Sequence, residues 1–322
     1  MAIKKIGVLT SGGDAPGMNA AVRAVVRTAL NRGLEVVGVY GGYDGLINGD
    51  IRPMNLRSVS NIINRGGTVL LSARSPEFRT EAGMQKAINQ CLKHEIEGLV
   101  IIGGDGSFRG AQDLTRRGFP CIGIPATIDN DISCCEHTIG YDTALNTCMD
   151  LCDKLRDTMQ SHGRCSVVEV MGRHAGYIAL NVGIAIGATS IIVPEVEYNF
   201  QRDVLDRIET AQATGKNDFI VVVAEGIGGA EQMAKDIEEK TGIVTRATIL
   251  GHVQRGGTPT LSDRVLASRF GARAVELLLE GKSNRVVAEQ LGKILDFDIE
   301  EALAMTKTLD MDLYNMALEI SI

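Results

Sequence analysis

The chain contains no tryptophan, and only 4% of its 322 residues are aromatic. It also lacks a hydrophobic run that could cross a membrane. The most apolar stretch, residues 178–193, is interrupted by Asn181, Thr189, Ser190 and several glycines, so we expect a buried helix and strand there. No short-period repeat or low-complexity segment is visible, and composition marks no domain boundary. These absences favour an ordinary globular protein without a membrane partner.

Excess positive charge is missing too. The formal net charge of −7 argues against general nucleic-acid binding, although local arginine clusters can still bind anions. The seven cysteines form no CxxC pair and no metal-binding spacing. Cys134 and Cys135 are adjacent, which suits reduced thiols better than a disulfide framework. With no signal peptide in the sequence, we expect a cytoplasmic protein.

Short apolar runs alternate with amphipathic stretches along the whole chain. We expect strands at 5–10, 35–40, 98–102, 121–124, 166–170, 190–193 and 219–224, and helices at 20–31, 84–94, 106–117, 143–161, 200–214, 231–241 and 261–280. Asn19 is the expected N-cap of the first helix, and Gly33 is its expected stop. This alternation predicts an α/β fold with a mainly parallel sheet and helices on its faces.

Three of the expected strands run into loops that carry glycine, hydroxyl or carboxylate groups. These loops are residues 11–19, 103–107 and 125–134. Glycines let the backbone approach an anion closely, and a following helix N-terminus offers N–H groups. Ligands of open α/β sheets bind beyond the carboxyl ends of the strands. Thr127, Asp129 and Asp131 are equipped to hydrogen-bond a hydroxyl, take its proton and help hold a divalent metal. The pattern predicts transfer of a phosphoryl group to an alcohol.

Common nucleotide-binding motifs do not account for these loops. Gly281-Lys282-Ser283 could end a Walker loop, but the motif fails because Glu276 stands where its first glycine belongs. A dinucleotide fingerprint beginning at Gly104 fails because Arg109 takes its last glycine position. Taken alone, Asp105 also suits a helix cap, and two aspartates in a D-x-D pattern also suit a turn.

Longer sequence blocks surround the loops. They are LTSGGDAPGMNAA at 9–21, NRGGT at 64–68, SAR at 72–74, IGGDGS at 102–107, TIDNDI at 127–132, VVEVMGRHAG at 167–176 and TRATILGHVQRGGTP at 245–259. In content and order, over nearly the whole chain, they resemble the bacterial ATP-dependent 6-phosphofructokinases. The resemblance implies two similar three-layer α/β domains with mainly parallel central sheets. It places ATP on residues 1–140 and 254–304, and fructose 6-phosphate on residues 141–253 and 305–322.

The resemblance implies roles for the residues that act on the phosphoryl group. Asp129 is the general base that takes the proton of the sugar 1-hydroxyl, and Asp131 supports the metal or that hydroxyl. Thr127 contacts the transferring phosphoryl group, and Arg173 stabilises the charge that develops on it. Asp105 is a ligand of Mg²⁺. The other ATP contacts implied are Gly12, Arg74, Gly104, Gly106 and Ser107, with Arg79 also near the nucleotide.

On the sugar side, the resemblance supplies cations for the 6-phosphate and an acceptor for the hydroxyls. Glu225 matches the acid that hydrogen-bonds the sugar hydroxyls, and Met171 and Gly172 lie against the sugar. In the family, two of the phosphate-binding arginines reach across a subunit interface, which implies a homo-oligomer with shared sites, usually a tetramer. The phosphate-binding residues implied are Arg164, Arg246, His252 and Arg255, of which the first two are the shared pair.

Two small residues indicate the phosphoryl donor. Pyrophosphate-dependent relatives carry an aspartate at the position of Gly106 and a lysine at that of Ala126, so we expect ATP. Ala126 is itself a departure, because ATP-dependent enzymes usually have glycine there. The alternatives are a pyrophosphate-dependent enzyme, a kinase that shares only the GGDGS loop, and a non-catalytic regulatory homologue. The intact block 127–132 argues against the second, and the retained Asp129 argues against the third.

Many relatives bind ADP or phosphoenolpyruvate at a second, inter-subunit site. The residues that match its cations are Arg23, Arg27, Arg156 and Lys216. Where the relatives have an arginine, an aspartate, a glutamate and a second lysine, this chain has Leu56, Asn61, Thr189 and Thr214. Thr189 has no charge with which to help ligate an effector-bound Mg²⁺. We therefore expect weak or absent allosteric regulation.

Overall fold

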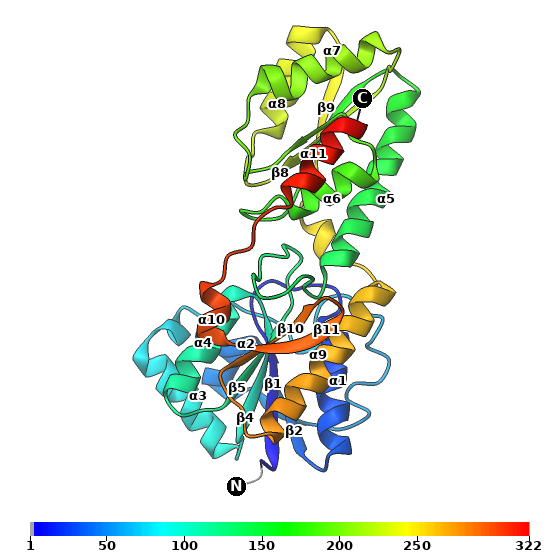
Figure 1. Ribbon diagram of the computed structural model, residues 1–322. Coiled ribbons are helices and arrows are strands. Elements are labelled where there is room, and N and C mark those ends of the chain that lie inside the picture. Colours follow the sequence, from blue (N-terminus) through cyan, green and yellow to red (C-terminus); the bar gives the residue numbers. More distant parts are fainter. Residues whose placement is uncertain (1–2, 322) are drawn as a thin grey trace. The chain divides into compact units, whose positions relative to one another are not determined.

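The computed structural model describes residues 3–321, which form two compact units (Figure 1). Unit 1 comprises Met1–Thr143 and Arg255–Lys307, and unit 2 comprises Ala144–Gln254 and Thr308–Ile322. The chain thus leaves one unit for the other after residues 143, 254 and 307, where the sequence led us to expect 140, 253 and 304. Across the described residues, no helix has the length and apolarity that a membrane span needs.

Unit 1 is built on a seven-stranded sheet. Its strands are β1 (Lys5–Thr10), β2 (Glu35–Val39), β3 (Ile51–Met54), β4 (Gly98–Gly103), β5 (Cys121–Pro125), β10 (Arg285–Gln290) and β11 (Lys293–Asp298). They lie in the order β11-β10-β5-β4-β1-β2-β3. The five central strands pair in parallel, and the two edge strands, β3 and β11, pair antiparallel with their neighbours.

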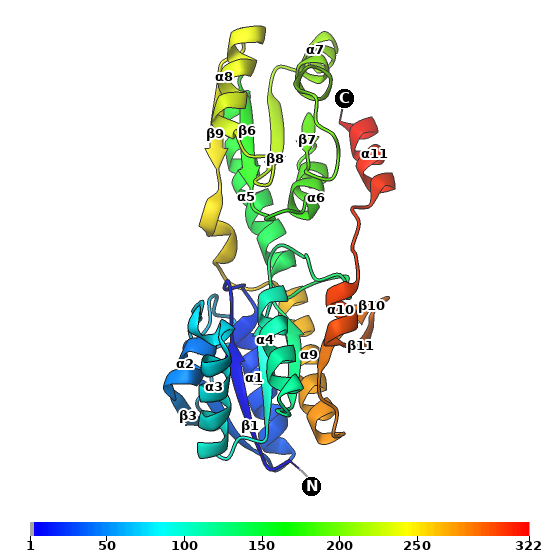
Figure 2. The ribbon, with the colours of Figure 1, turned by 90° about the vertical axis from the view of Figure 1, so that its left-hand side faces the viewer.

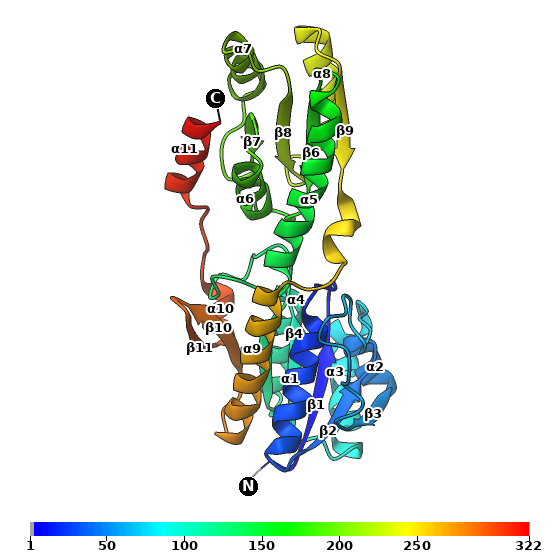
Figure 3. The same ribbon diagram turned by 90° about the vertical axis from the view of Figure 1, so that its right-hand side faces the viewer.

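Helices cover both faces of this sheet. They are α1 (Met18–Asn31), α2 (Gly42–Asn48), α3 (Glu81–Lys93), α4 (Asp105–Arg116), α9 (Leu261–Leu279) and α10 (Ile299–Ala304), with a 3₁₀ turn, η1, at Glu77–Arg79. Helices α1 and α9 lie side by side on one face, and α2, α3 and α4 lie on the other (Figures 2 and 3). A Cβ atom on Gly271 of α9 would lie 2.6 Å from the Cβ of Ala24, so a glycine is needed where these helices cross.

Unit 2 contains a four-stranded parallel sheet in the order β7-β8-β6-β9. Its strands are β6 (Cys165–Val170), β7 (Ser190–Ile192), β8 (Phe219–Ala224) and β9 (Thr245–Ile249). Its helices are α6 (Tyr177–Ala185), α7 (Asp206–Ala213), α8 (Ala230–Thr241) and α11 (Met311–Ile320), and α5 (Tyr141–Gln160) carries the chain in from unit 1. A π-helical turn, η2 (Gln201–Leu205), precedes α7, and a 3₁₀ turn, η3 (Gly251–Arg255), follows β9.

The alternation of side chains along the strands gives unit 2 its three layers. Ile192, Val221 and Val223 belong to a buried cluster with residues of α7 and α8. The neighbouring Ile191 faces the other way, where a Cβ atom on Gly183 of α6 would lie 2.5 Å from it. Helix α11 packs in turn on α6. Both units are thus three-layer α/β structures with mainly parallel sheets, as the sequence predicted.

Every strand and helix expected from the sequence is present, and residues 178–193 form a buried helix and strand. The expected role of Asn19 was wrong. Helix α1 begins at Met18, and its N-cap is Gly17, in the left-handed region at φ 110°. The Asn19 side chain instead donates to the carbonyls of Arg65 and Gly66 and accepts from the Val69 N–H. It is committed to the 65–69 loop and so cannot cap its own helix.

Candidate active site

Three loops of unit 1 leave one edge of the sheet because their strands are parallel neighbours. Strand β4 lies between β1 and β5, with Thr10 paired to Ile102 and Gly103 paired to Pro125. The three strands therefore end level. The chain runs from β1 outward to β2 on one side and from β4 to β5 on the other, so β1 and β4 flank a topological switch point. Ligands of open α/β sheets bind at such a point.

Small residues are required where the loops meet. The N–H of Ser11 donates to β4, and the N–H of Ala126 donates to the carbonyl of Gly103, both at 2.9 Å. A Cβ atom on Gly103 would lie 2.4 Å from Ser107 Oγ and from Ser11 O. Gly12, at φ 86°, faces the same Ser107 hydroxyl. A side chain at Gly103 is thus excluded, and the backbone can come close to a ligand, as a phosphate-binding edge needs.

Asp105 opens α4 beside the loop that carries Asp131. It is not a side-chain cap, because the N-cap is Gly104 and no side chain caps this helix. Asp105 accepts a hydrogen bond from Arg109 Nε at 3.1 Å, in an ion pair whose side chains are 36% and 64% exposed. Such a solvated pair contributes little and is easily displaced. Asp105 and Asp131 line one pocket together with Ser133, so two acidic residues border the same space.

The loop that carries both candidate aspartates is fixed by Asn130, which lies between them at φ 53°. Asn130 Nδ2 donates to the carbonyl of Glu136 at 3.0 Å, and Asn130 Oδ1 accepts from the N–H of Thr138 at 3.1 Å. The hydroxyl of Thr138 donates to the carbonyl of Thr127 at 2.6 Å. The backbone is therefore held on both sides of Asp129, which is only 7% exposed.

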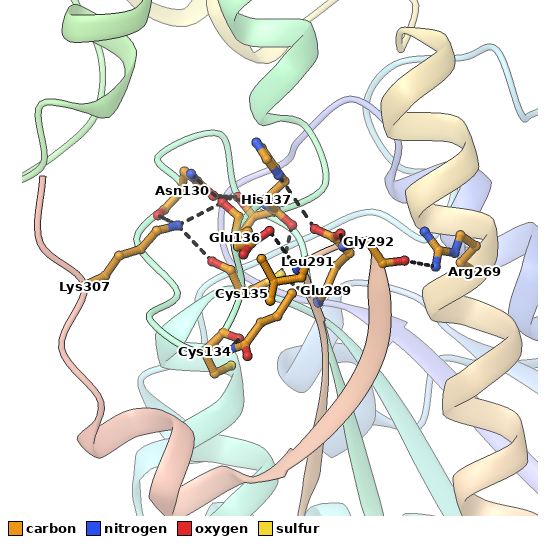
Figure 4. Close-up of polar contacts among 12 residues, drawn as sticks. Asn130, Cys134, Cys135, Glu136, His137, Arg269, Glu289, Leu291, Gly292 and Lys307 are labelled. Carbon is orange, nitrogen blue, oxygen red and sulfur yellow. Dashed lines mark hydrogen bonds and ion pairs between the residues drawn. The ribbon is translucent and has the colours of Figure 1, made fainter. Parts of the chain in front are cut away.

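Lys307, the last residue of unit 1 in the sequence, donates hydrogen bonds to the same loop (Figure 4). Its Nζ donates to the carbonyls of Asn130, Cys135 and Glu136 at 3.0, 2.8 and 3.1 Å. Burial lowers the pKa of Lys307, and the nearby charge of Asp131 partly opposes that shift. Three acceptors match the full donor capacity of an ammonium group. Nothing in the sequence pointed to this role, because Lys307 lies in a segment without a motif.

Two of the arginines predicted as ligands, Arg255 and Arg74, belong to unit 1. Arg255 Nη1 donates to the carbonyl of Asp14 at 3.2 Å, and a Cβ atom on Gly13 would lie 2.8 Å from the same nitrogen. Arg255 thus covers the first glycine loop and belongs to unit 1. Arg74 is exposed on the segment that precedes η1.

In unit 2, Glu225 supports the loop after β6. Its Oε1 accepts hydrogen bonds from the N–H groups of Gly172 and Arg173, at 3.2 and 2.6 Å. Both residues have positive φ, 141° and 59°, a conformation that the glutamate helps to hold. Met171 precedes them and is partly exposed. Glu225 is therefore both a candidate sugar ligand and the brace of the loop that presents Arg173.

Gln254 is a site residue that the sequence analysis did not single out. It is fully buried, and its Oε1 accepts from the Met171 N–H at 3.0 Å, while its Nε2 donates to the carbonyl of Gly251 at 3.0 Å. It thus ties the loop after β6 to η3, on which His252 is exposed. The only sign of this role in the sequence was its position next to Arg255, a predicted ligand.

Arg164 and Arg246 lie at the other end of the unit 2 sheet. Arg164 precedes β6, and Arg246 pairs with Ser166 near the start of that strand. Met171, by contrast, follows the end of β6. At roughly 3.3 Å per residue, the seven steps from 164 to 171 span about 23 Å. Arg246 is exposed and pairs with Glu238 at 3.1 Å. The structure therefore separates these arginines from the other predicted sugar ligands of unit 2.

The four predicted effector residues also fall into two groups. Arg23 and Arg27 lie one turn apart on α1, in unit 1. Arg156 and Lys216 belong to unit 2, where Arg156 pairs with Asp218 at 3.5 Å. Burial lowers the pKa of Lys216, and the charge of Asp218 opposes that shift. One carboxylate thus already attracts both unit 2 cations, which leaves less positive charge for an anionic ligand.

We predict that Lys307→Met loosens the 128–138 loop, because three carbonyls lose their charged donor. Each lost bond of this kind costs about 1–3 kcal/mol. A loss of about 1.4 kcal/mol raises the equilibrium constant for local opening of the loop tenfold. Amide hydrogen exchange at Cys135 and Thr138 should accelerate at least about tenfold. Lys293→Met, on an exposed lysine of β11, is the control and should exchange as wild type does. Unchanged exchange in Lys307→Met would contradict the anchor.

Comparison with known proteins fits this architecture. The phosphofructokinase family model matches residues 5–278. An ATP-dependent 6-phosphofructokinase of Bacillus cytotoxicus is 58% identical over 320 residues, which cover 99% of this chain and 100% of that protein. Its namesake in Brevibacillus brevis is 56% identical over the same shares of both chains. The solved phosphofructokinase of Saccharomyces cerevisiae aligns with a TM-score of 0.88 and 36% identity, covering 99% of this chain but 48% of that one, about half its length. The chain belongs to the phosphofructokinase family.

Proposed function

We propose that this chain transfers the γ-phosphoryl group of ATP to the 1-hydroxyl of fructose 6-phosphate, giving fructose 1,6-bisphosphate and ADP, as a glycolytic enzyme of the cytoplasm. The observation that carries the proposal is the level ending of β1, β4 and β5, which gathers two glycine loops and the Asp129 loop at one edge. Phosphoryl transfer depends on positioning and charge rather than covalent chemistry, and this edge supplies both.

On the donor side, the backbone at Gly12 and Gly104 and the hydroxyl of Ser107 receive the ATP phosphates. Asp129 accepts the proton of the sugar 1-hydroxyl as its oxygen attacks the γ-phosphorus. The loop bonds to Asn130 keep that carboxylate in place, so little reorganisation is needed. Arg173 stabilises the charge on the transferring group, with its backbone held by Glu225. The remaining donor-side contacts proposed are Arg74, Gly106 and Thr127.

Mg²⁺ fits the residues present. It prefers one or two carboxylates and keeps several waters, and the pocket shared by Asp105 and Asp131 is lined by two acidic residues. When bound with ATP, the ion neutralises phosphate charge. We assign Asp105 as its ligand, with Asp131 in support of the ion or of the sugar hydroxyl.

On the acceptor side, Met171, Gly172 and Glu225 contact the sugar, and cationic side chains hold its 6-phosphate. The distance between the two ends of the unit 2 sheet supports the assignment of these cations to two different sugar sites. His252 serves the sugar site of its own chain, with Arg255 from the glycine-loop edge, whereas Arg164 and Arg246 serve that of a second copy. The functional protein is then a homo-oligomer, and we propose a tetramer.

A pyrophosphate-dependent reaction is the alternative. Gly106 distinguishes the two, because the pyrophosphate-dependent relatives carry an aspartate there. Among the described residues, nothing lies within 4 Å of a Cβ atom placed on Gly106. The space beside α4 is therefore open to a nucleotide, which favours ATP.

We predict turnover with Mg²⁺ and ATP and none with pyrophosphate. Gly106→Asp should fold normally, because its side chain meets no protein atom, yet it should lose ATP-dependent turnover by overlap and charge repulsion with the nucleotide. Product formation from fructose 6-phosphate with each donor measures this, with Gly106→Ala as the uncharged control. Wild-type activity with pyrophosphate equal to that with ATP would overturn the donor assignment.

We predict that Asp129→Ser binds fructose 6-phosphate but loses about 10²–10⁴-fold in kcat, the usual contribution of a positioned general base. KM should change little, because the base acts in the transition state. Steady-state kinetics together with circular dichroism test this. A folded variant within a few-fold of wild-type kcat would exclude Asp129 as the base.

Shared sites predict complementation between inactive subunits. Asp129→Ser and Arg246→Ala subunits, dissociated together and reassembled, should regain part of the wild-type activity because some hybrid sites receive neither change. Asp129→Ser mixed with Thr127→Ala is the matched control. Both of those residues lie on one loop, so each hybrid site keeps a defect. Failure to recover activity in demonstrably mixed oligomers would place Arg246 at its own chain's site.

We predict weak regulation by ADP and phosphoenolpyruvate, since Asp218 attracts Arg156 and Lys216 and Thr189 supplies no metal-ligating charge. Charge-assisted bonds are the strong ones in phosphate binding. Millimolar concentrations of either ligand should shift half-saturation by fructose 6-phosphate less than about twofold, against the 5–150-fold typical of allosteric coupling. A large, saturable shift that disappears in Arg23→Ala would show a working effector site.

A further inference from the structure

The loop after β5 meets the β10–β11 hairpin at three side chains outside the proposed phosphoryl-transfer machinery: Glu136, His137 and Glu289 (Figure 4). The two backbones are locked together there. The N–H of Glu136 donates to the carbonyl of Glu289 at 3.0 Å, and the N–H of Glu289 donates to Cys135 Sγ at 3.4 Å. The side chains therefore converge on a rigid frame.

Each carboxylate is oriented by the turn of the hairpin through one of its two oxygens. Glu289 Oε1 accepts from the N–H of Gly292 at 2.7 Å, and Glu136 Oε2 accepts from the N–H of Leu291 at 3.1 Å. Within residues 3–321, the other oxygen of each accepts no hydrogen bond. The Glu289 side chain is nevertheless only 12% exposed, and a nearby cation stabilises a carboxylate that is largely shielded from water.

The nearby cations are engaged elsewhere. Arg269 Nη2 donates to the carbonyl of Gly292 at 2.8 Å, and the Lys307 ammonium is directed at backbone carbonyls (Figure 4). His137 Nδ1 lies 3.7 Å from Glu289 Oε2. That separation is too long for a hydrogen bond. It is close to the roughly 3.3–3.6 Å that separates two ligand atoms on a tetrahedral ion with bonds of about 2.0–2.2 Å.

One nitrogen and two oxygen ligand atoms, all within 4.8 Å of one another, can thus surround a single cation. Imidazole with carboxylates suits Zn²⁺ and its neighbours among the transition metals better than Mg²⁺ or Ca²⁺, which take oxygen ligands. Three protein ligands leave a fourth position for water. Glu136 and His137 are exposed, so an ion can enter from solvent.

We propose that Glu136, His137 and Glu289 form a binding site for a divalent transition metal of the zinc type, separate from the Mg²⁺ that accompanies ATP. The bound ion links the loop that carries Asp129 and Asp131 to the β10–β11 hairpin. Because all three ligands belong to unit 1, the site lies within one chain. It does not depend on the function proposed above.

The test is a Zn²⁺ titration of the purified, chelator-treated full-length protein by calorimetry, in excess Mg²⁺ to occupy other carboxylate sites. We expect saturable binding of one ion per chain and a rise in melting temperature. His137→Asn and Glu289→Gln should each weaken binding at least about tenfold, the lower end of the effect of disturbing a metal shell. Co²⁺ serves as a spectroscopic probe, and its visible absorption should report a nitrogen ligand that His137→Asn removes.

His162→Asn is the matched control, since His162 is an exposed histidine of unit 2 far from these carboxylates in sequence, and it should bind Zn²⁺ as wild type does. No saturable binding to the wild-type protein would overturn the proposal. Equal affinity in the wild type, His137→Asn and Glu289→Gln would also overturn it, because the ion would then sit on other residues. If one of the two variants, His137→Asn or Glu289→Gln, does not fold, the other still tests the proposal.

Discussion

The level ending of three parallel strands is the constraint on which the rest of the molecule depends. Parallel pairing of β1, β4 and β5 leaves no choice about where their loops go, because each strand must end at the same edge as its neighbour. That edge then imposes its own demands on the sequence. Gly103 must be a glycine because Ser11 and Ser107 already occupy the space of a side chain. The sheet register therefore determines both where the three loops lie and which residues fit in them.

In unit 2, the direction of the strands keeps candidate ligands apart instead of bringing them together. A parallel strand has two different ends, and residues flanking β6 on both sides are candidate sugar ligands. Arg164 and Met171 cannot meet within one sheet, because the strand between them is rigid and about 20 Å long. Two ends serving one substrate require a second copy of the chain. The proposed homo-oligomer therefore rests on the length of a strand.

The sequence predicted what is local and missed what is distant. Glycines and carboxylates directly after apolar runs marked all three loops, because these residues follow the end of their strand within ten positions. The β10–β11 hairpin escaped notice because Glu289 and Asp296 dilute its alternation of apolar residues. Asn19 looked like a cap, yet its hydrogen bonds go to residues almost fifty positions away. The supports of the site, Lys307, Gln254 and the bracing oxygen of Glu225, have long-range partners and so leave no local pattern.

The loop that carries Asp129 shows why those supports matter. Asn130 and Lys307 both act on its backbone, so the shape of the loop is set by groups other than the reacting carboxylate. Lys307 is also the last residue of unit 1 before the chain enters unit 2. The C-terminal crossing therefore begins at a residue that holds the Asp129 loop through three hydrogen bonds.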